Sequence, residues 1–113
     1  MESNTVYVSL GVAAAANMVR RYIIEGSLSG ELLDDYNVRN NDGNVCRVLV
    51  FEKYYYRVSN RLILTVVLDN FGGRTRVHYV SGGGGQGAIF RFDWGSSDSF
   101  SNCVYYALQN YIV

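Results

Sequence analysis

The stretch SGGGGQGAIF, residues 81–90, contains the pattern G-x-G-x-x-G over residues 82–87, which can bind the phosphates of a dinucleotide. That chemistry needs a strand before the glycines and a helix after them, because the helix N-terminus meets the pyrophosphate. Here the residues after Gly87 alternate as a strand does, so we interpret the glycines as a wide turn or bend between antiparallel strands. The functional alternative is a glycine rim, at Gly84 and Gly85, that opens over a pocket.

Few other side chains suggest catalysis. His78 is the single histidine, and no nucleophile motif such as G-x-S-x-G accompanies it. Cys46 and Cys103 are far apart, and two cysteines with one histidine cannot supply an ordinary structural zinc site within one chain. We therefore expect a protein that is not an enzyme and holds no metal or other cofactor. The adjacent carboxylates Asp34 and Asp35 leave paired-acid chemistry open.

Composition limits the class of protein. The chain has 113 residues, 49% of them hydrophobic, and its formal net charge is zero. This predicts one domain over residues 1–113, with no whole-molecule attraction to nucleic acid or anionic membranes. No apolar run is long enough to span a membrane, and the apolar segment 5–16 lacks the basic start of a signal peptide. We expect a cytoplasmic protein with reduced cysteines.

Periodicity predicts the elements that must position these residues. Apolar side chains recur at helical spacing in two segments, residues 12–25 and the segment from Ser96 to the C-terminus. Six segments alternate as strands do: residues 5–10, 30–39, 45–58, 61–69, 74–81 and 88–94. Residues 30–39 also suit a short helix, but the turn signal NNDGN that follows them favours a hairpin. The expected fold is α+β in the order β-α-β-β-β-β-β-α, a curved antiparallel sheet of about six strands with both helices packed on one face.

Alternation along residues 45–58 sorts their side chains onto two faces. We assign to the helix-covered face Cys46, Val48, Val50, Glu52, Tyr54 and Tyr56. A carboxylate on a core face is costly without a partner, so Glu52 with Tyr54 and Tyr56 predicts a ligand pocket between the sheet and the C-terminal helix. The alternative is a β-bulge at residues 52–53 that turns Glu52 to solvent.

The opposite face of the predicted sheet gathers basic and aromatic side chains. Its members are Arg47, Phe51, Lys53, Tyr55, Arg57, Arg61, Arg74, Arg76, His78 and Arg91. Such a face can stack the bases and pair with the phosphates of single-stranded nucleic acid, through Arg57, Arg76, His78 and Arg91. Solvated cross-strand pairing is the alternative, because acids share this face and no aromatic RNP-type motif is present.

The strings FEKYYYR, RLILTVVLDN and TRVHYVSGGGGQGAIFRFDWGSSDSF, in this order, resemble a family of small bacterial proteins described only as a domain of unknown function. The resemblance covers most of the chain from about Gly26 onward. It implies a bacterial, cytoplasmic, single-domain protein and assigns no activity. The element order is also similar to that of helix-grip, Bet v1-like domains, which often hold an apolar ligand around a C-terminal helix. This chain is short for that fold, which implies a small or filled cavity.

These observations predict a non-enzymatic module that binds a small apolar or amphipathic ligand or a protein partner. Nucleic-acid binding through the Arg/Tyr-rich face is the alternative. Self-association into a homodimer, through sheet edges or tyrosine-rich faces, is a third possibility.

Overall fold

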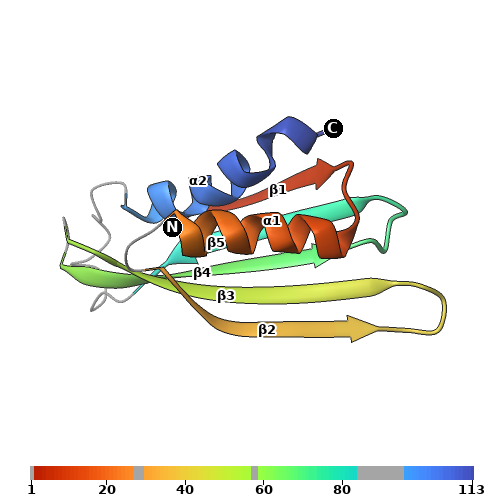
Figure 1. Ribbon diagram of the computed structural model, residues 1–113, viewed down its shortest axis with the longest axis horizontal. Helices are drawn as coiled ribbons and strands as arrows, with labels where there is room; N and C mark the ends of the chain where they lie inside the picture. Colours follow the sequence, from red (N-terminus) through yellow and green to blue (C-terminus); the bar gives the residue numbers. More distant parts are fainter. Residues whose placement is uncertain (1, 27–29, 57–58, 84–95) are drawn as a thin grey trace.

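The computed structural model describes residues 2–26, 30–56, 59–83 and 96–113 (Figure 1). Their elements are β1 (Glu2–Val8), α1 (Val12–Glu25), β2 (Glu31–Arg39), β3 (Val45–Tyr55), β4 (Asn60–Asp69), β5 (Thr75–Gly82) and α2 (Ser96–Leu108), with a short 3₁₀ helix at Gln109–Tyr111. The described strands form one antiparallel sheet in the spatial order β1-β5-β4-β3-β2. The predicted α+β class is confirmed, and the sixth strand, predicted over residues 88–94, lies outside the described residues. No helix in the described segments is long and apolar enough to cross a membrane.

Both helices pack on the same face of the sheet (Figure 1). The buried stripe of α1 is the predicted one: Val12, Ala15, Ala16, Val19 and Ile23. Its alanines favour the helix and let it lie close to β3 and β4, and it ends at Gly26 as expected. The second helix, α2, packs on β5, β4 and β1 and also contacts α1.

The core lies between this helix layer and the sheet. Strand β4 contributes the predicted face, Leu62, Leu64, Val66 and Leu68, and β5 contributes Val77 and Tyr79. The α2 side chains that meet them are Phe100, Val104, Ala107 and Leu108. A buried hydrogen bond of 2.8 Å joins the hydroxyls of Ser81 and Ser101, so α2 is fixed to β5 by a polar contact as well as by packing.

Tight turns join the central strands. The predicted hairpin turn at residues 40–44 is confirmed: the side-chain oxygen of Asn40 accepts hydrogen bonds from the backbone N–H groups of Asp42 and Asn44. Gly43 has φ +88° and Gly73, in the turn before β5, has φ +86°. Glycine adopts this left-handed conformation without the steric cost that a side chain adds.

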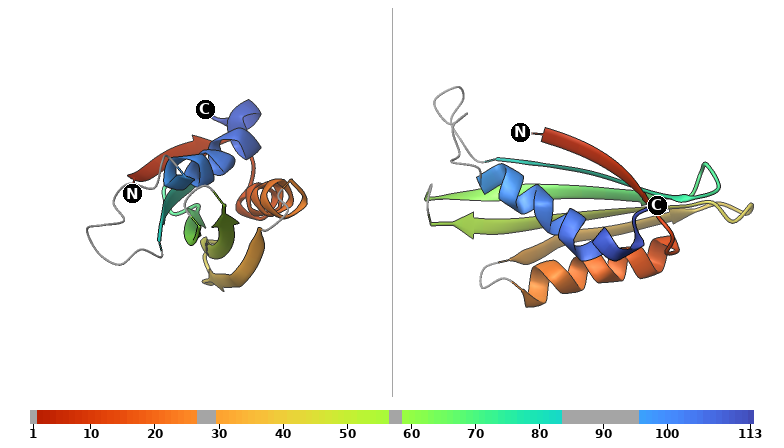
Figure 2. Two further views of the ribbon diagram at one scale, coloured as in Figure 1. Left: turned by 90° about the vertical axis from the view of Figure 1, so that its left-hand side faces the viewer. Right: turned by 90° about the horizontal axis from the view of Figure 1, so that it is seen from above.

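The sheet is not strongly curled, which corrects the expected curved sheet that grips the C-terminal helix. Figure 2 shows two layers, with α1 and α2 side by side over one face. The reason is that α1 covers β2, β3 and β4 while α2 covers β5, β4 and β1. Because the two helices together cover the width of the sheet, its apolar face is buried without the sheet curling around a single helix.

Strand β2 is an edge strand that is held to α1 and β3 by charge. Arg47 of β3 donates two hydrogen bonds of 2.8 Å to the carboxylate of Asp35 in β2. Arg20 of α1 lies 3.6 Å from the same carboxylate. The hydrogen bond from Arg47 is the main cause that lowers the pKa of Asp35, with smaller attraction from both arginines.

Asp35→Asn is expected to lower the free energy of unfolding by at most about 1 kcal/mol, because a bidentate ion pair near the surface is lost. Since folding lowers the pKa of Asp35, its stabilisation is complete above the unfolded-state pKa of about 4 and is lost as the pH falls through the lower folded-state value. Urea unfolding of wild type and variant between neutral and acid pH measures this. Asp34→Asn, an exposed neighbour, is the control. Equal acid sensitivity of Asp35→Asn and wild type would contradict the assignment.

Candidate functional site

Strand β3 determines much of the composition of the sheet face that the described helices do not cover. Its register with β4 is unbroken from Cys46 to Tyr55, and Leu49 and Phe51 are fully buried under the helices. Cys46, Val48, Val50, Glu52 and Tyr54 therefore lie on the opposite face, which we call the helix-free face. Our face assignment for this strand is wrong, because the core takes the larger Leu49 and Phe51 and an alternating strand then turns every other side chain outward. The bulge proposed at residues 52–53 is also wrong: the irregularity lies in β2, between Leu32 and Asp34.

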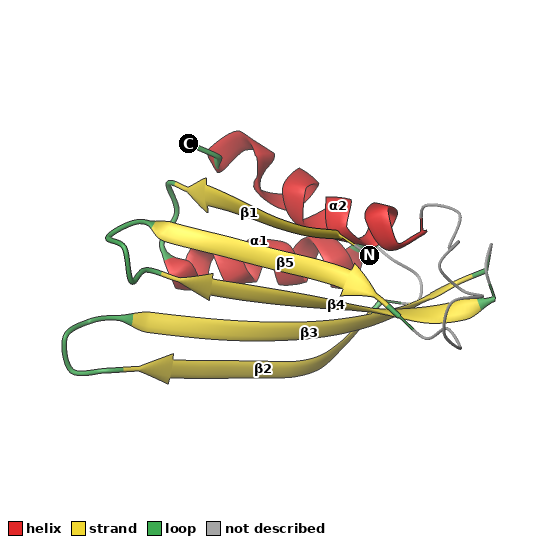
Figure 3. Ribbon diagram, turned by 180° about the vertical axis from the view of Figure 1, so that it is seen from behind, coloured by secondary structure: helices red, strands yellow, loops and turns green. Residues whose placement is uncertain are grey.

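The helix-free face has an uncharged centre that spans four strands. Figure 3 views the molecule from this side, with the strands in front of both helices. Strand pairing places nine uncharged side chains next to one another, which we call the central patch: Tyr36, Val38, Cys46, Val48, Val50, Ile63, Thr65, Val67 and Val80. Tyr36 is 58% exposed, and the residues on β3, β4 and β5 are half-buried by their neighbours on the sheet.

Sequence reasoning missed this patch. A signal for it exists, because residues 48–51 and 62–68 are apolar on both alternating faces, except at Thr65. Strands with that pattern are typically buried on both sides of their sheet.

One end of the central patch carries three of the residues predicted to bind a ligand. Arg61 donates a hydrogen bond of 3.2 Å to Glu52, and its guanidinium lies 5.8 Å from the centre of the Tyr54 ring. The rings of Tyr54 and Tyr56 meet edge to face at 4.8 Å. Glu52 and Tyr54 are thus brought together, but on the helix-free face rather than between the sheet and α2. The predicted glycine rim at residues 84–85 lies outside the described residues.

The other end of the patch carries a second ion pair beside a shallow hollow. Arg76 donates hydrogen bonds of 3.0 and 3.1 Å to the carboxylate of Asp69, which also accepts the backbone N–H of Phe71. The Thr5 hydroxyl and His78 Nδ1 are 2.8 Å apart. These side chains line a hollow of about 370 Å³ together with Tyr7 and Val67. Arg76 and His78 therefore lie on the outer face, as predicted.

The predicted basic face is wrong for strand β3. Its odd-numbered residues, Arg47, Phe51, Lys53 and Tyr55, lie on the helix side. Arg57 and Arg91 lie outside the described residues, and Arg74 sits in a turn over the Tyr7 ring, 4.2 Å from its centre. The arginines that the described strands place on the helix-free face, Arg61 and Arg76, each pair with a carboxylate. Their positive charge is therefore largely neutralised.

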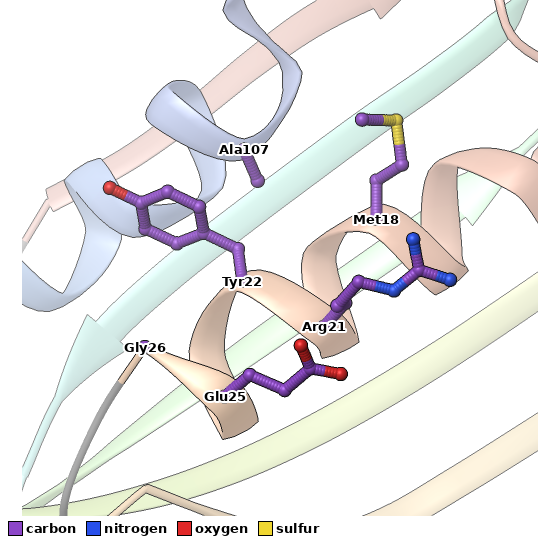
Figure 4. Close-up of a pocket in the computed structure, with 6 residues that line it drawn as sticks. All are labelled: Met18, Arg21, Tyr22, Glu25, Gly26 and Ala107. Carbon is purple, nitrogen blue, oxygen red and sulfur yellow. The ribbon is translucent and has the colours of Figure 1, made fainter.

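A groove of about 500 Å³ lies on the other side of the molecule, between the two helices. Its lining residues are Met18, Arg21, Tyr22, Glu25, Gly26 and Ala107. Figure 4 shows the side chains of Met18 and Tyr22 extending from α1 toward α2 on either side of Ala107, with Arg21 and Glu25 farther from α2. The groove thus has an apolar wall and a charged edge.

Within the described segments, no three His, Cys, Asp or Glu side chains are grouped so that they could hold a metal ion.

The sequence of residues 1–112 matches a family of unknown function, DUF6054. The chain belongs to this family. The resemblance noted from the sequence is confirmed at that level, and DUF6054 extends it to the N-terminal strand and helix. Searches of curated proteins and of solved structures found no match, so the similarity to helix-grip domains gains no support from them.

The two ion pairs of the helix-free face differ in burial, so breaking them is expected to lower the free energy of unfolding by different amounts. Asp69 is only 5% exposed, so Asp69→Ala is expected to lower the free energy of unfolding by about 1–3 kcal/mol, because Arg76 and a backbone N–H lose their acceptor. Glu52→Ala breaks the more exposed pair with Arg61 and is expected to cost less than about 1 kcal/mol. Denaturant unfolding measures both values. Equal costs would contradict the difference in burial.

Proposed function

We propose that this protein is a non-catalytic module that binds a protein partner through the helix-free face of its sheet. The observation that carries the proposal is that the middle parts of β3 and β4, residues 48–51 and 62–68, are apolar on both faces except at Thr65, whereas the described helices cover one face. Large contiguous apolar patches on a protein surface typically mark interaction sites. The central patch is contiguous across β2, β3, β4 and β5.

The shape and charge of this face favour a protein over other ligands. A small molecule binds best in a concave site that buries most of its surface, and a sheet that is not strongly curled offers a broad, shallow surface instead. Nucleic-acid affinity depends on cations that neutralise phosphates, and Arg61 and Arg76 already pair with carboxylates. An uncharged centre with polar groups at its ends is the arrangement of protein interfaces.

A photo-crosslinking amino acid at Val48, in the central patch, tests the proposal in cells that make the protein. We expect it to form a covalent adduct of discrete mass with a protein, which is either another copy of this chain or a different one. The same group at Ile24, which is 39% exposed on α1, is the control. The proposal would be wrong if position 48 gave no adduct, or if position 24 gave the same adduct.

The groove between α1 and α2 supports a second candidate function, the binding of a small amphipathic ligand. Its volume of about 500 Å³ falls within the range of ligand pockets, about 300–1,000 Å³. Met18 and Tyr22 supply adaptable and aromatic contacts, while Arg21 and Glu25 are placed to meet a polar head group.

Native mass spectrometry of gently purified protein tests the groove. A bound ligand appears as a discrete added mass that denaturation removes, and Tyr22→Ala is expected to abolish it. Tyr106→Ala removes a tyrosine of similar exposure, 49% against 44%, from α2 and is the matched control. A bare chain mass, or an added mass that survives Tyr22→Ala, would exclude the groove as the site of a tightly held ligand.

A further inference from the structure

We infer that the partner of the helix-free face is a second copy of this chain, packed sheet against sheet; this inference rests on the proposed function. Sheets that pack face to face bury apolar inner faces about 10 Å apart. The central patch provides such a face on each copy, and the zero net charge of the chain lets two copies approach without overall repulsion.

The area of the face suits a stable dimer. Five strands spaced about 4.8 Å apart are about 24 Å wide, and the nine residues from Cys46 to Tyr54 extend over about 27 Å. The product is about 650 Å² for a flat surface before side-chain relief is added. A stable interface of standard size buries about 600–1,000 Å² on each partner. The face is therefore large enough to be one half of such an interface.

The outward side chains of the central strand β4 are self-complementary about its midpoint. They are Arg61, Ile63, Thr65, Val67 and Asp69 in order along the strand. A two-fold axis that crosses β4 at Thr65, at right angles to the strand, places Ile63 over Val67 of the second copy. It also places Arg61 over Asp69 of that copy. Isologous dimers require this kind of pairing, in which each contact occurs twice.

The in-chain ion pairs extend this complementarity. Glu52 pairs with Arg61 at one end of the face, and Asp69 pairs with Arg76 at the other. The two-fold axis at Thr65 places these two ion pairs next to each other across the interface. Negative and positive charges then alternate from Glu52 and Arg61 of one copy to Asp69 and Arg76 of the second copy. A two-fold axis along β4 would instead place Arg61 over Arg61 and Asp69 over Asp69, and like-charge contacts oppose association. Along β4, charge therefore favours the antiparallel crossing of the two strands. At the edge of the sheet the same axis brings Asp34 of β2, which is in register with Val50 and Thr65, over Asp34 of the second copy, and this contact opposes association.

Sedimentation velocity over a concentration series up to about 0.1 mM, well above the dissociation constant of most standard interfaces, tests this dimer. We expect the wild type to sediment at twice the 12.7 kDa chain mass. Val67→Arg buries an unpaired charge at the interface and is expected to raise the dissociation constant about a hundredfold or more. Ile24→Arg, on the exposed side of α1, is the matched control and should remain dimeric. Thermal unfolding checks that both variants fold.

A crosslink tests the position of the axis. Thr65→Cys, in a chain with Cys46→Ala and Cys103→Ala, places one thiol at the centre of the face of each copy, and Cys46→Ala keeps its position in the central patch apolar. A bismaleimide that spans about 10 Å, the distance between packed sheets, should join two copies. Ile24→Cys in the same background should give no crosslink.

The outcomes separate this inference from the proposed function. A dimer that Val67→Arg dissociates and that Thr65→Cys crosslinks supports the inference. A dimer that survives Val67→Arg, or that fails to crosslink through Thr65→Cys, uses another interface and overturns it. A monomer at every concentration also overturns it. The proposed function then stands if the photo-crosslinker at Val48 captures a different protein, and falls if it captures none.

Discussion

A sheet has two faces, and the two helices in the described part of this chain cover one of them. The rest of the account depends on that constraint, because β3 and β4 supply apolar side chains to both faces. Leu49 and Phe51 on one side complete the core under the helices, while Val50 and Ile63 on the other meet no helix in the described part of the chain. Burying apolar surface is the dominant favourable term in association as it is in folding. In the described part of the chain, no element thus covers the apolar side chains on this second face.

Sequence periodicity predicted the fold well where an element has a single apolar face. The buried stripe of α1 and the inward face of β4 are the predicted ones, as are the hairpin at residues 40–44 and the end of α1 at Gly26. Prediction failed on β3, because its two faces are both apolar in the middle of the strand, at residues 48–51, and differ there mainly in side-chain volume. Alternation cannot choose between such faces, and the choice follows from which set fills the space under the helices.

The same ambiguity explains the outcome for the candidate site. Glu52 lies beside apolar residues, as the sequence indicated, but these residues belong to the helix-free face. There Glu52 accepts a hydrogen bond from Arg61. The residues of β3 predicted to belong to a nucleic-acid-binding surface lie on the helix side instead, because the faces of this strand were assigned the wrong way round. What took its place, an aliphatic centre between two ion pairs, arises only when four strands are aligned in register, and no short motif encodes it. Membership of DUF6054 assigns no activity, so the functional account rests on this surface.

The central claim is that the aliphatic face of the sheet is covered by a second copy of this chain in solution. Methyl NMR with a soluble paramagnetic agent tests it most directly, because the agent broadens the signals of methyl groups that solvent reaches. The account predicts that the methyl signals of Val48, Val50 and Val67 stay sharp at a concentration at which Ile24 on α1 is broadened. Val67→Arg should then expose Val48 and Val50 to the agent. Broadening of these valine signals in the wild-type protein to the same extent as Ile24 would contradict the claim.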